Sequence, residues 1–254
     1  QTIQKLIDIV GKNNVLTDEK DTRLYRQGRR YGTGNVLAVV VPGTLVEQWK
    51  VLEIAVDAGC IVIMQAANTG LTGGSTPFGD DYDRPVLLMS TRRLRGIQVI
   101  NEGKQVICLP GATLDRLEKE LAVFNREPHS VIGSSCIGAS VLGGVCNNSG
   151  GALVRRGPAY TELALYARVN DQGSLELVNH LGVNLGHSSE EILSNLEQQK
   201  YQIADIENES QCCASDHRYI KDVAKIDENT PARFNADPSR LFEASGSAGK
   251  VCVF

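Results

Sequence analysis

The stretch "CIVIMQAANTGLTGGSTP" (60–77) decides the fold, because it joins an apolar run to a long loop of small residues. Its first five residues are typical of a buried strand. Upstream, "VLAVVVP" (36–42) predicts another buried strand, and "LVEQWKVLEIAVDA" (45–58) predicts a helix that ends at Gly59. Strand, helix and strand at this spacing predict a βαβ unit and hence a parallel sheet. A third strand is expected at "PVLLMS" (85–90), after the loop.

The loop itself, "QAANTGLTGGSTP" (65–77), is longer than topology requires, since most connections between elements have about four to six residues. Gly70, Gly73 and Gly74 allow backbone angles that other residues avoid, and they let a ligand approach the main chain closely. The loop contains no positively charged residue. An anion bound here would therefore have to be held by backbone N–H groups.

A second glycine-rich region, "PHSVIGSSCIGASVLGGVCNNSGG" (128–151), interleaves glycine with serine and asparagine. Two separate segments of this composition could wrap a long, phosphate-bearing ligand from both sides. The alternative is tight packing of loops over a sheet, which needs no ligand. Because the first loop follows a parallel strand, the two segments together favour a nucleotide cofactor.

The rest of the chain predicts antiparallel strands and helices. The expected elements are a helix at 1–11, a hairpin at 96–110 with its turn at 101–104, a helix at 113–124, a short helix near 139–145, a second hairpin at 162–180, one helical segment within the polar stretch 188–232, a short helix at 237–245 and a strand from 249 onward. We therefore expect a parallel α/β part (1–92) and a mainly antiparallel α+β part (93–254). The apolar end at 251–254 suggests a fragment.

Composition excludes several classes of function. A net charge of −4 and an aromatic content of 5% argue against nucleic acid as a partner. No apolar run approaches the ~18 residues of a membrane-spanning helix. The seven cysteines suggest no disulfide framework, and the four histidines show no metal-ligand spacing, so we predict no metal site. "GTGNVL" (32–37) and "ASGSAGKV" (244–251) fail the Rossmann and Walker A patterns.

The loop 65–77 resembles the phosphate-binding loop of the p-cresol methylhydroxylase/vanillyl-alcohol oxidase flavoprotein family. "REPHSVIGSSCIGASVLGGVCNNSGGALVRRGPAYTE" (126–162) is similar to the second flavin-binding segment of this family. The resemblance implies an α+β, PCMH-type FAD-binding fold, with a small parallel βαβ subdomain packed with a larger, mainly antiparallel subdomain. The cap domain that carries substrate groups in this family is expected to lie outside these residues.

The resemblance also implies a set of cofactor contacts. The FAD pyrophosphate would lie on the main chain of the first loop, closed by two residues near its end: Ala66, Ala67, Asn68, Thr69, Gly70, Gly74 and Ser75. Gly133, Ser140 and Gly150 would line the cofactor from the second region, and Val253 from the last strand. Many relatives tether the flavin through a histidine in the first loop. No histidine lies between Gln65 and Pro77, so we expect non-covalent FAD, with a thioether to Cys136 or Cys146 as a minor alternative.

The implied reaction is oxidation of D-lactate to pyruvate by hydride transfer to FAD, with a membrane quinone as electron acceptor. The implied location is peripheral, on the cytoplasmic face of the bacterial inner membrane, with attachment through parts outside these residues. No catalytic residue is assigned, and these residues alone are expected to be inactive. Two alternatives stay open: a dehydrogenase of another 2-hydroxy acid, such as glycolate or 2-hydroxyglutarate, and a non-catalytic nucleotide-binding module.

Overall fold

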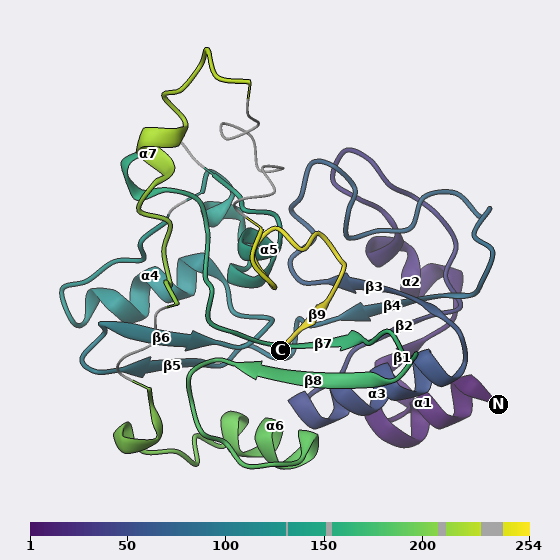
Figure 1. The fold of residues 1–254 in the computed structure, drawn as a ribbon. Helices are drawn as coiled ribbons and strands as arrows, with labels where there is room; N and C mark the ends of the chain where they lie inside the picture. Colours follow the sequence, from purple (N-terminus) through teal and green to yellow (C-terminus); the bar gives the residue numbers. More distant parts are fainter. Residues whose placement is uncertain (131, 151–153, 208–211, 230–240) are drawn as a thin grey trace. The chain divides into compact units, whose positions relative to one another are not determined.

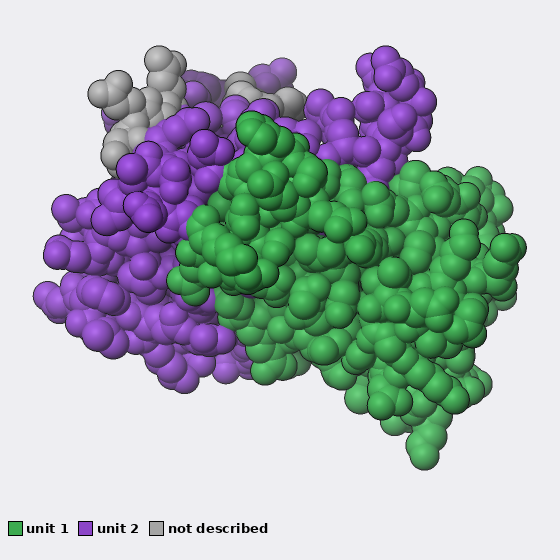
Figure 2. All heavy atoms as spheres, turned by 90° about the horizontal axis from the view of Figure 1, so that it is seen from below, with its two compact units in different colours: residues 1–96, 185–200 green, residues 97–184, 201–254 purple. Residues whose placement is uncertain are grey.

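The computed structural model describes residues 1–130, 132–150, 154–207, 212–229 and 241–254, and these form two compact units. Unit 1 contains residues 1–96 and 185–200, and unit 2 contains residues 97–184 and 201–254 (Figure 2). The sequence-based division after residue 92 places 185–200 in the second part, whereas the contacts of this segment group it with unit 1.

Unit 1 is built on a four-stranded sheet in the order β1-β2-β4-β3 (Figure 1). Its strands are β1 (Val15–Leu16), β2 (Ala38–Val40), β3 (Ile61–Gln65) and β4 (Val86–Ser90). β4 pairs in parallel with both β2 and β3, which confirms the predicted βαβ unit and parallel sheet. All five residues of β4 are buried, as expected for a central parallel strand that is covered on both faces.

The helices of unit 1 are α1 (Thr2–Val10), α2 (Glu19–Arg26), α3 (Leu45–Asp57) and α6 (Ser189–Glu197). α3 is the crossover between β2 and β3, and it begins where the Thr44 hydroxyl accepts a hydrogen bond from the Glu47 N–H. α1 and α6 both pack against α3. α6 is attached there by Glu197, whose carboxylate accepts a hydrogen bond of 3.0 Å from the Leu45 N–H.

Two elements of unit 1 do not appear among the expected ones. α2 has no apolar stripe, because it buries Thr22 and leaves Leu24 74% exposed. Hydrophobic periodicity therefore gives no signal for this helix. β1 has two residues, which is too short for any alternation to show, and it pairs antiparallel to β2.

Unit 2 is mainly antiparallel, as predicted. In the described residues it contains a hairpin of β5 (Ile97–Ile100) and β6 (Gln105–Cys108), and a sheet in the order β8-β7-β9. The strands of that sheet are β7 (Ala164–Val169), β8 (Leu175–His180) and β9 (Cys252–Val253), so the expected C-terminal strand pairs with β7. The α-helices are α4 (Leu114–Ala122), α5 (Val141–Cys146) and α7 (Tyr219–Asp222).

Short 3-10 helices complete the described elements: Lys12–Asn14, Ser135–Ile137, Val154–Arg156 and Ile203–Asp205. The prediction of one helical segment within 188–232 was wrong, because this stretch contains both α6 and α7. The expected helix at 237–245 lies largely outside the described residues, and its described part, 241–245, is a turn closed by the Phe242–Ser245 bridge. No helix in the described part of the chain is long and apolar enough to span a membrane.

Candidate cofactor site

The glycine-rich loop begins at Gln65, the last residue of β3, and so lies at the carboxyl end of a parallel strand. Open α/β sheets bind ligands at this edge. Across the described residues, no backbone N–H of residues 66–75 donates a hydrogen bond to another backbone group. These residues are exposed or half-buried. The loop therefore presents a row of main-chain donors without any charged side chain, which fits a pyrophosphate.

Gln65 fixes the two ends of this loop. Its side chain is 3% exposed, and its Nε2 donates to the carbonyl oxygens of Tyr25 and Ser75, both at 2.8 Å. Its own carbonyl accepts a hydrogen bond of 2.9 Å from the Thr91 N–H. The amide thus ties the start of the loop to its end, ten positions later in the sequence. Sequence patterns did not predict this role for Gln65, although a polar residue at the end of an apolar strand is a visible signal.

The polar side chains of the loop also hold its own shape. Asn68 has a φ of 52°, and its Nδ2 donates to the Gln27 carbonyl at 2.9 Å. The Ser75 hydroxyl donates to Asn68 Oδ1 at 3.0 Å. Because the side chains of Asn68 and Ser75 bond to the protein, these two residues offer mainly their main chain to a ligand.

The glycines of the loop differ in what surrounds them. A Cβ added to Gly70 or Gly74 would meet no protein atom within 4 Å. A Cβ added to Gly73, which has a φ of 75°, would lie 3.1 Å from the Tyr31 carbonyl oxygen. Packing therefore accounts for Gly73, whereas Gly70 and Gly74 border open space that a ligand can occupy.

In unit 2, Ser140 caps the N-terminus of α5, and its hydroxyl accepts a hydrogen bond of 2.9 Å from the Gly143 N–H. The expected cofactor residue is thus a buried helix cap, with Gly143 as its partner. Gly133 precedes this helix and, like Gly74, would have open space around an added Cβ.

The remaining expected residues of unit 2 are also placed by packing. A Cβ on Gly150 would lie 3.0 Å from the hydroxyl of Tyr219 in α7, so this glycine allows α7 to approach. Val253 in β9 pairs with Tyr166 and packs against the same buried cluster as Val141 of α5. The structure therefore packs Val253 and Val141, the residue after Ser140, against one core. The expected residues 66–75 lie together in unit 1, and those of the second region lie in unit 2.

Burial shifts the pKa of two titratable groups in the second region. Burial lowers the pKa of His129, and a hydrogen bond to the Tyr160 backbone opposes this effect. Burial raises the pKa of the Cys146 thiol to about 11, so this thiol is protonated and a poor nucleophile at neutral pH. Cys136 is exposed. Among the described residues no cluster of three or more His, Cys, Asp or Glu side chains could hold a metal ion.

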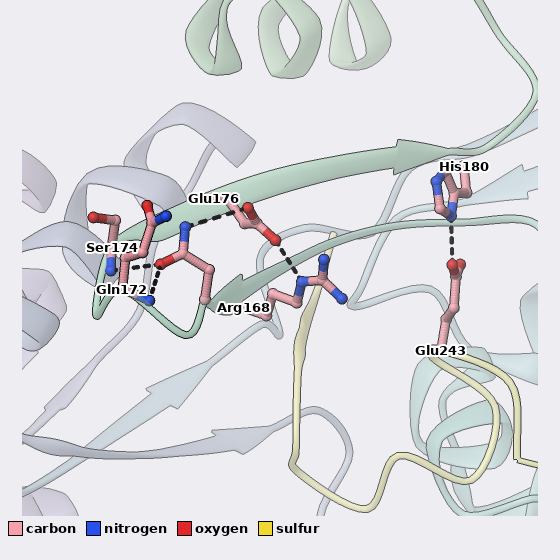
Figure 3. A network of polar contacts seen from close by, with 7 residues as sticks. Arg168, Gln172, Ser174, Glu176, His180 and Glu243 are labelled. Atoms are coloured by element: carbon pink, nitrogen blue, oxygen red, sulfur yellow. Dashed lines mark hydrogen bonds and ion pairs between the residues drawn. The ribbon is translucent and has the colours of Figure 1, made fainter.

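Polar side chains on the β7–β8 hairpin are joined by hydrogen bonds and ion pairs (Figure 3). Arg168 on β7 pairs with Glu176 on β8, and the Asn170 side chain closes the turn between the two strands. His180, at the end of β8, pairs with Glu243. These contacts hold the hairpin and the segment leading into β9, and they identify no acid or base for catalysis.

Known proteins resemble this chain over its whole length. A quinone-dependent D-lactate dehydrogenase from Haemophilus influenzae is 60% identical over 256 residues, which cover 100% of this chain and 45% of that protein. The enzyme of the same name from Escherichia coli is 55% identical over 252 residues, which cover 99% of this chain and 44% of that protein. The chain thus spans less than half the length of these relatives.

Solved structures share the fold at low sequence identity. An alkyldihydroxyacetonephosphate synthase superposes with a TM-score of 0.58 at 15% identity, covering 76% of this chain and 36% of that one. A p-cresol methylhydroxylase with substrate bound gives 0.55 at 17% identity, covering 75% and 37%. These likenesses confirm the predicted α+β, PCMH-type fold. A model of the FAD binding domain family matches residues 36–175, more than half of the 254 residues. The chain belongs to this family of FAD-binding domains, and FAD is its cofactor.

Proposed function

We propose that this chain is the FAD-binding part of a respiratory flavoenzyme that oxidises D-lactate to pyruvate and passes the electrons to a membrane quinone. Support for the substrate and the acceptor comes from the relatives named quinone-dependent D-lactate dehydrogenase, at 60% and 55% identity. Support for the cofactor's place comes from the chain itself.

One observation carries the proposal about the site: the backbone N–H groups of residues 66–75 have no backbone partner in the described structure. We propose that the pyrophosphate of FAD lies on the main chain of residues 66–70 and that Gly74 and Ser75 close the loop over it. These N–H groups belong to exposed or half-buried residues, so an anion could replace water on several of them at once.

In the second region, we propose that Gly133, Ser140, Gly150 and Val253 line the cofactor. The open space at Gly133 supports a direct contact there. Ser140 already caps α5, so its contribution would come through its main chain and the position of that helix. We propose that the FAD is non-covalent, because the loop has no histidine and the Cys146 thiol is protonated.

Bound FAD supplies the acceptor for the hydride that leaves the α-carbon of the hydroxy acid. The residues of this chain hold and orient the cofactor. The two hydrogen bonds that the Gln65 side chain donates to the Tyr25 and Ser75 carbonyls, the Gln65 clamp, keep the loop in its binding shape. We assign no residue here as the base that takes the hydroxyl proton. We propose that the substrate groups, like the membrane attachment on the cytoplasmic face of the inner membrane, belong to the length of the relatives that this chain does not span.

Two measurements test the proposal. The purified chain should take up FAD stoichiometrically, quench its fluorescence and release it on acid precipitation. A folded chain that takes up no added FAD would remove the basis of the proposal. In the intact protein under anaerobic conditions, D-lactate should bleach the flavin, whereas L-lactate, glycolate and 2-hydroxyglutarate should bleach it at least tenfold more slowly. Faster bleaching by glycolate or 2-hydroxyglutarate would identify that acid, rather than D-lactate, as the substrate. It would leave the proposed cofactor site unaffected.

A further inference from the structure

Residues 27–33, "QGRRYGT", form a tight turn that is attached to the cofactor loop. The Gly28 N–H donates to the Gly32 carbonyl at 2.7 Å, and Gln27 and Thr33 form an antiparallel bridge at its base. A Cβ on Gly28 would lie 1.8 Å from the Tyr31 carbonyl oxygen, so the turn closes this tightly only with glycine there. We name this segment the arginine turn, because Arg29 and Arg30 lie at its tip.

The arginine turn contacts the cofactor loop on both sides of its glycine pair. On one side, the Asn68 side chain donates to the Gln27 carbonyl at 2.9 Å. On the other, Gly32 has a φ of 89°, and a Cβ there would lie 2.0 Å from the Thr76 hydroxyl. The Tyr31 carbonyl also lies against Gly73. The turn and the loop therefore form one packed substructure within unit 1.

The turn brings positive charge to a loop that has none. Arg29 and Arg30 are exposed, and neither forms an ion pair with a described residue. The segment that follows the loop carries Asp80 and Asp81, which are likewise exposed and form no ion pair within the described part of the chain. It is joined to the turn, since the Gly79 N–H donates to the Thr33 carbonyl at 2.8 Å. Arg29 and Arg30 thus match in number the two negative charges that Asp80 and Asp81 place after the loop.

We infer that Arg29 and Arg30 are part of the cofactor site and attract the pyrophosphate to the uncharged loop by long-range electrostatics. This inference rests on the proposed FAD site and adds two side chains to it. The loop's N–H groups supply short-range contacts, and the arginines supply the net charge that speeds association and offsets the aspartates. Because both guanidinium groups are exposed, each contributes modestly, and salt screens the contribution.

The test is FAD binding to the chain freed of flavin, followed by fluorescence quenching at equilibrium and in stopped flow. The variant R29Q/R30Q should bind FAD about three- to tenfold more weakly in about 20 mM salt, mainly through slower association. The difference should fall below about twofold in about 0.5 M salt. R29K/R30K keeps the charge and should bind within about twofold of wild type.

The matched control is K5Q/K12Q, which changes the net charge by the same amount in unit 1. Lys5 on α1 and Lys12 after it are exposed, and neither forms an ion pair with a described residue. This control should bind FAD like wild type at every salt concentration. Equal weakening in both double variants would reduce the effect to net charge and overturn the inference. R29Q/R30Q binding like wild type at low salt would overturn it as well. A wild-type chain that fails to bind FAD would instead contradict the proposed function.

Discussion

Replacing Gln65 with methionine tests whether the buried amide holds the cofactor loop. Methionine has a similar length and fills the same space, but it cannot donate hydrogen bonds. The carbonyl oxygens of Tyr25 and Ser75, which lie 2.8 Å from Nε2 in the wild-type protein, would lose their donor. Each lost hydrogen bond costs about 1 kcal/mol net, and more where the acceptor stays without water. Two such bonds at a site that is 3% exposed give a loss of about 2–3 kcal/mol.

This loss should appear in one of two measurements. If the loop unfolds only with the rest of unit 1, the free energy of unfolding in urea should fall by about 2–3 kcal/mol. If the loop opens by itself, unfolding should change little and FAD should bind about 30- to 150-fold more weakly, which is the same free energy expressed as affinity. Gln65→Glu should be worse than Gln65→Met in either measurement, because a carboxylate would face two carbonyl oxygens.

The control is Gln4→Met on α1, where the exposed amide donates to Asp8. This change should shift the free energy of unfolding by less than about 0.5 kcal/mol, as surface substitutions usually do. If Gln65→Met matched this control in stability and also bound FAD like wild type, the clamp would have no energetic role. Such a result would show that the Gln65 side chain does not hold the loop in its binding shape.

Further predictions concern the loop and the helices that pack near it. Gly74→Asp should leave the fold of the flavin-free chain intact, because the new Cβ meets open space. It should weaken FAD binding about a hundredfold, or ~3 kcal/mol. Normal FAD binding by the folded variant would contradict the assignment of the loop to the pyrophosphate. Burial raises the pKa of Glu197, so ionisation of its carboxyl group weakens the fold as pH rises through that pKa. Glu197→Gln should therefore gain stability relative to wild type between pH 4 and pH 7. A stability difference between the two proteins that does not change with pH would refute this. Hydrogen bonds from the backbone lower the pKa of Glu191, so its contribution is present above its unfolded pKa and lost on acidification; Glu191→Gln should therefore lose stability at pH 7 and match wild type near pH 3 in the same unfolding assay. Thr44→Ala should cost about 1 kcal/mol in urea unfolding through loss of the α3 cap, with Thr44→Ser close to wild type; an equal loss in both variants would point away from capping.

Sequence patterns predicted the elements whose burial is periodic or continuous. The runs that became β2, β3 and β4 are apolar because a parallel sheet covers them on both faces, and β4 is buried throughout. The order of the strands could not be predicted in this way, since β4 lies between β2 and β3 although it follows both in the sequence. α2 could not be predicted either, because its attachment relies on Thr22 and Tyr25 rather than on an apolar stripe.

The chemistry of the site could be predicted from the sequence, but the residues that hold the loop in shape could not. A loop of small residues without charge already predicts that an anion is held by the main chain. Two of the groups that hold the loop, however, are distant in the sequence: the Tyr25 carbonyl, which accepts from Gln65, is forty positions away, and the Gln27 carbonyl, which accepts from Asn68, is forty-one positions away. Only a folded chain brings these groups together, so no pattern within residues 65–77 could indicate them.

The glycines show most clearly what the structure adds. In the sequence Gly70, Gly73 and Gly74 look alike, and composition treats each as evidence for a ligand. In the structure a Cβ at Gly73 would press on the Tyr31 carbonyl, so the protein's own packing explains this glycine. A Cβ added at Gly70 or Gly74 would meet no protein atom within 4 Å, and neither residue has a left-handed φ. A glycine that neither packing nor backbone geometry explains is the one whose missing side chain a ligand would use. By this criterion Gly70, Gly74 and Gly133, rather than the glycine-rich composition as a whole, are the positions at which the proposed FAD contacts should be tested first.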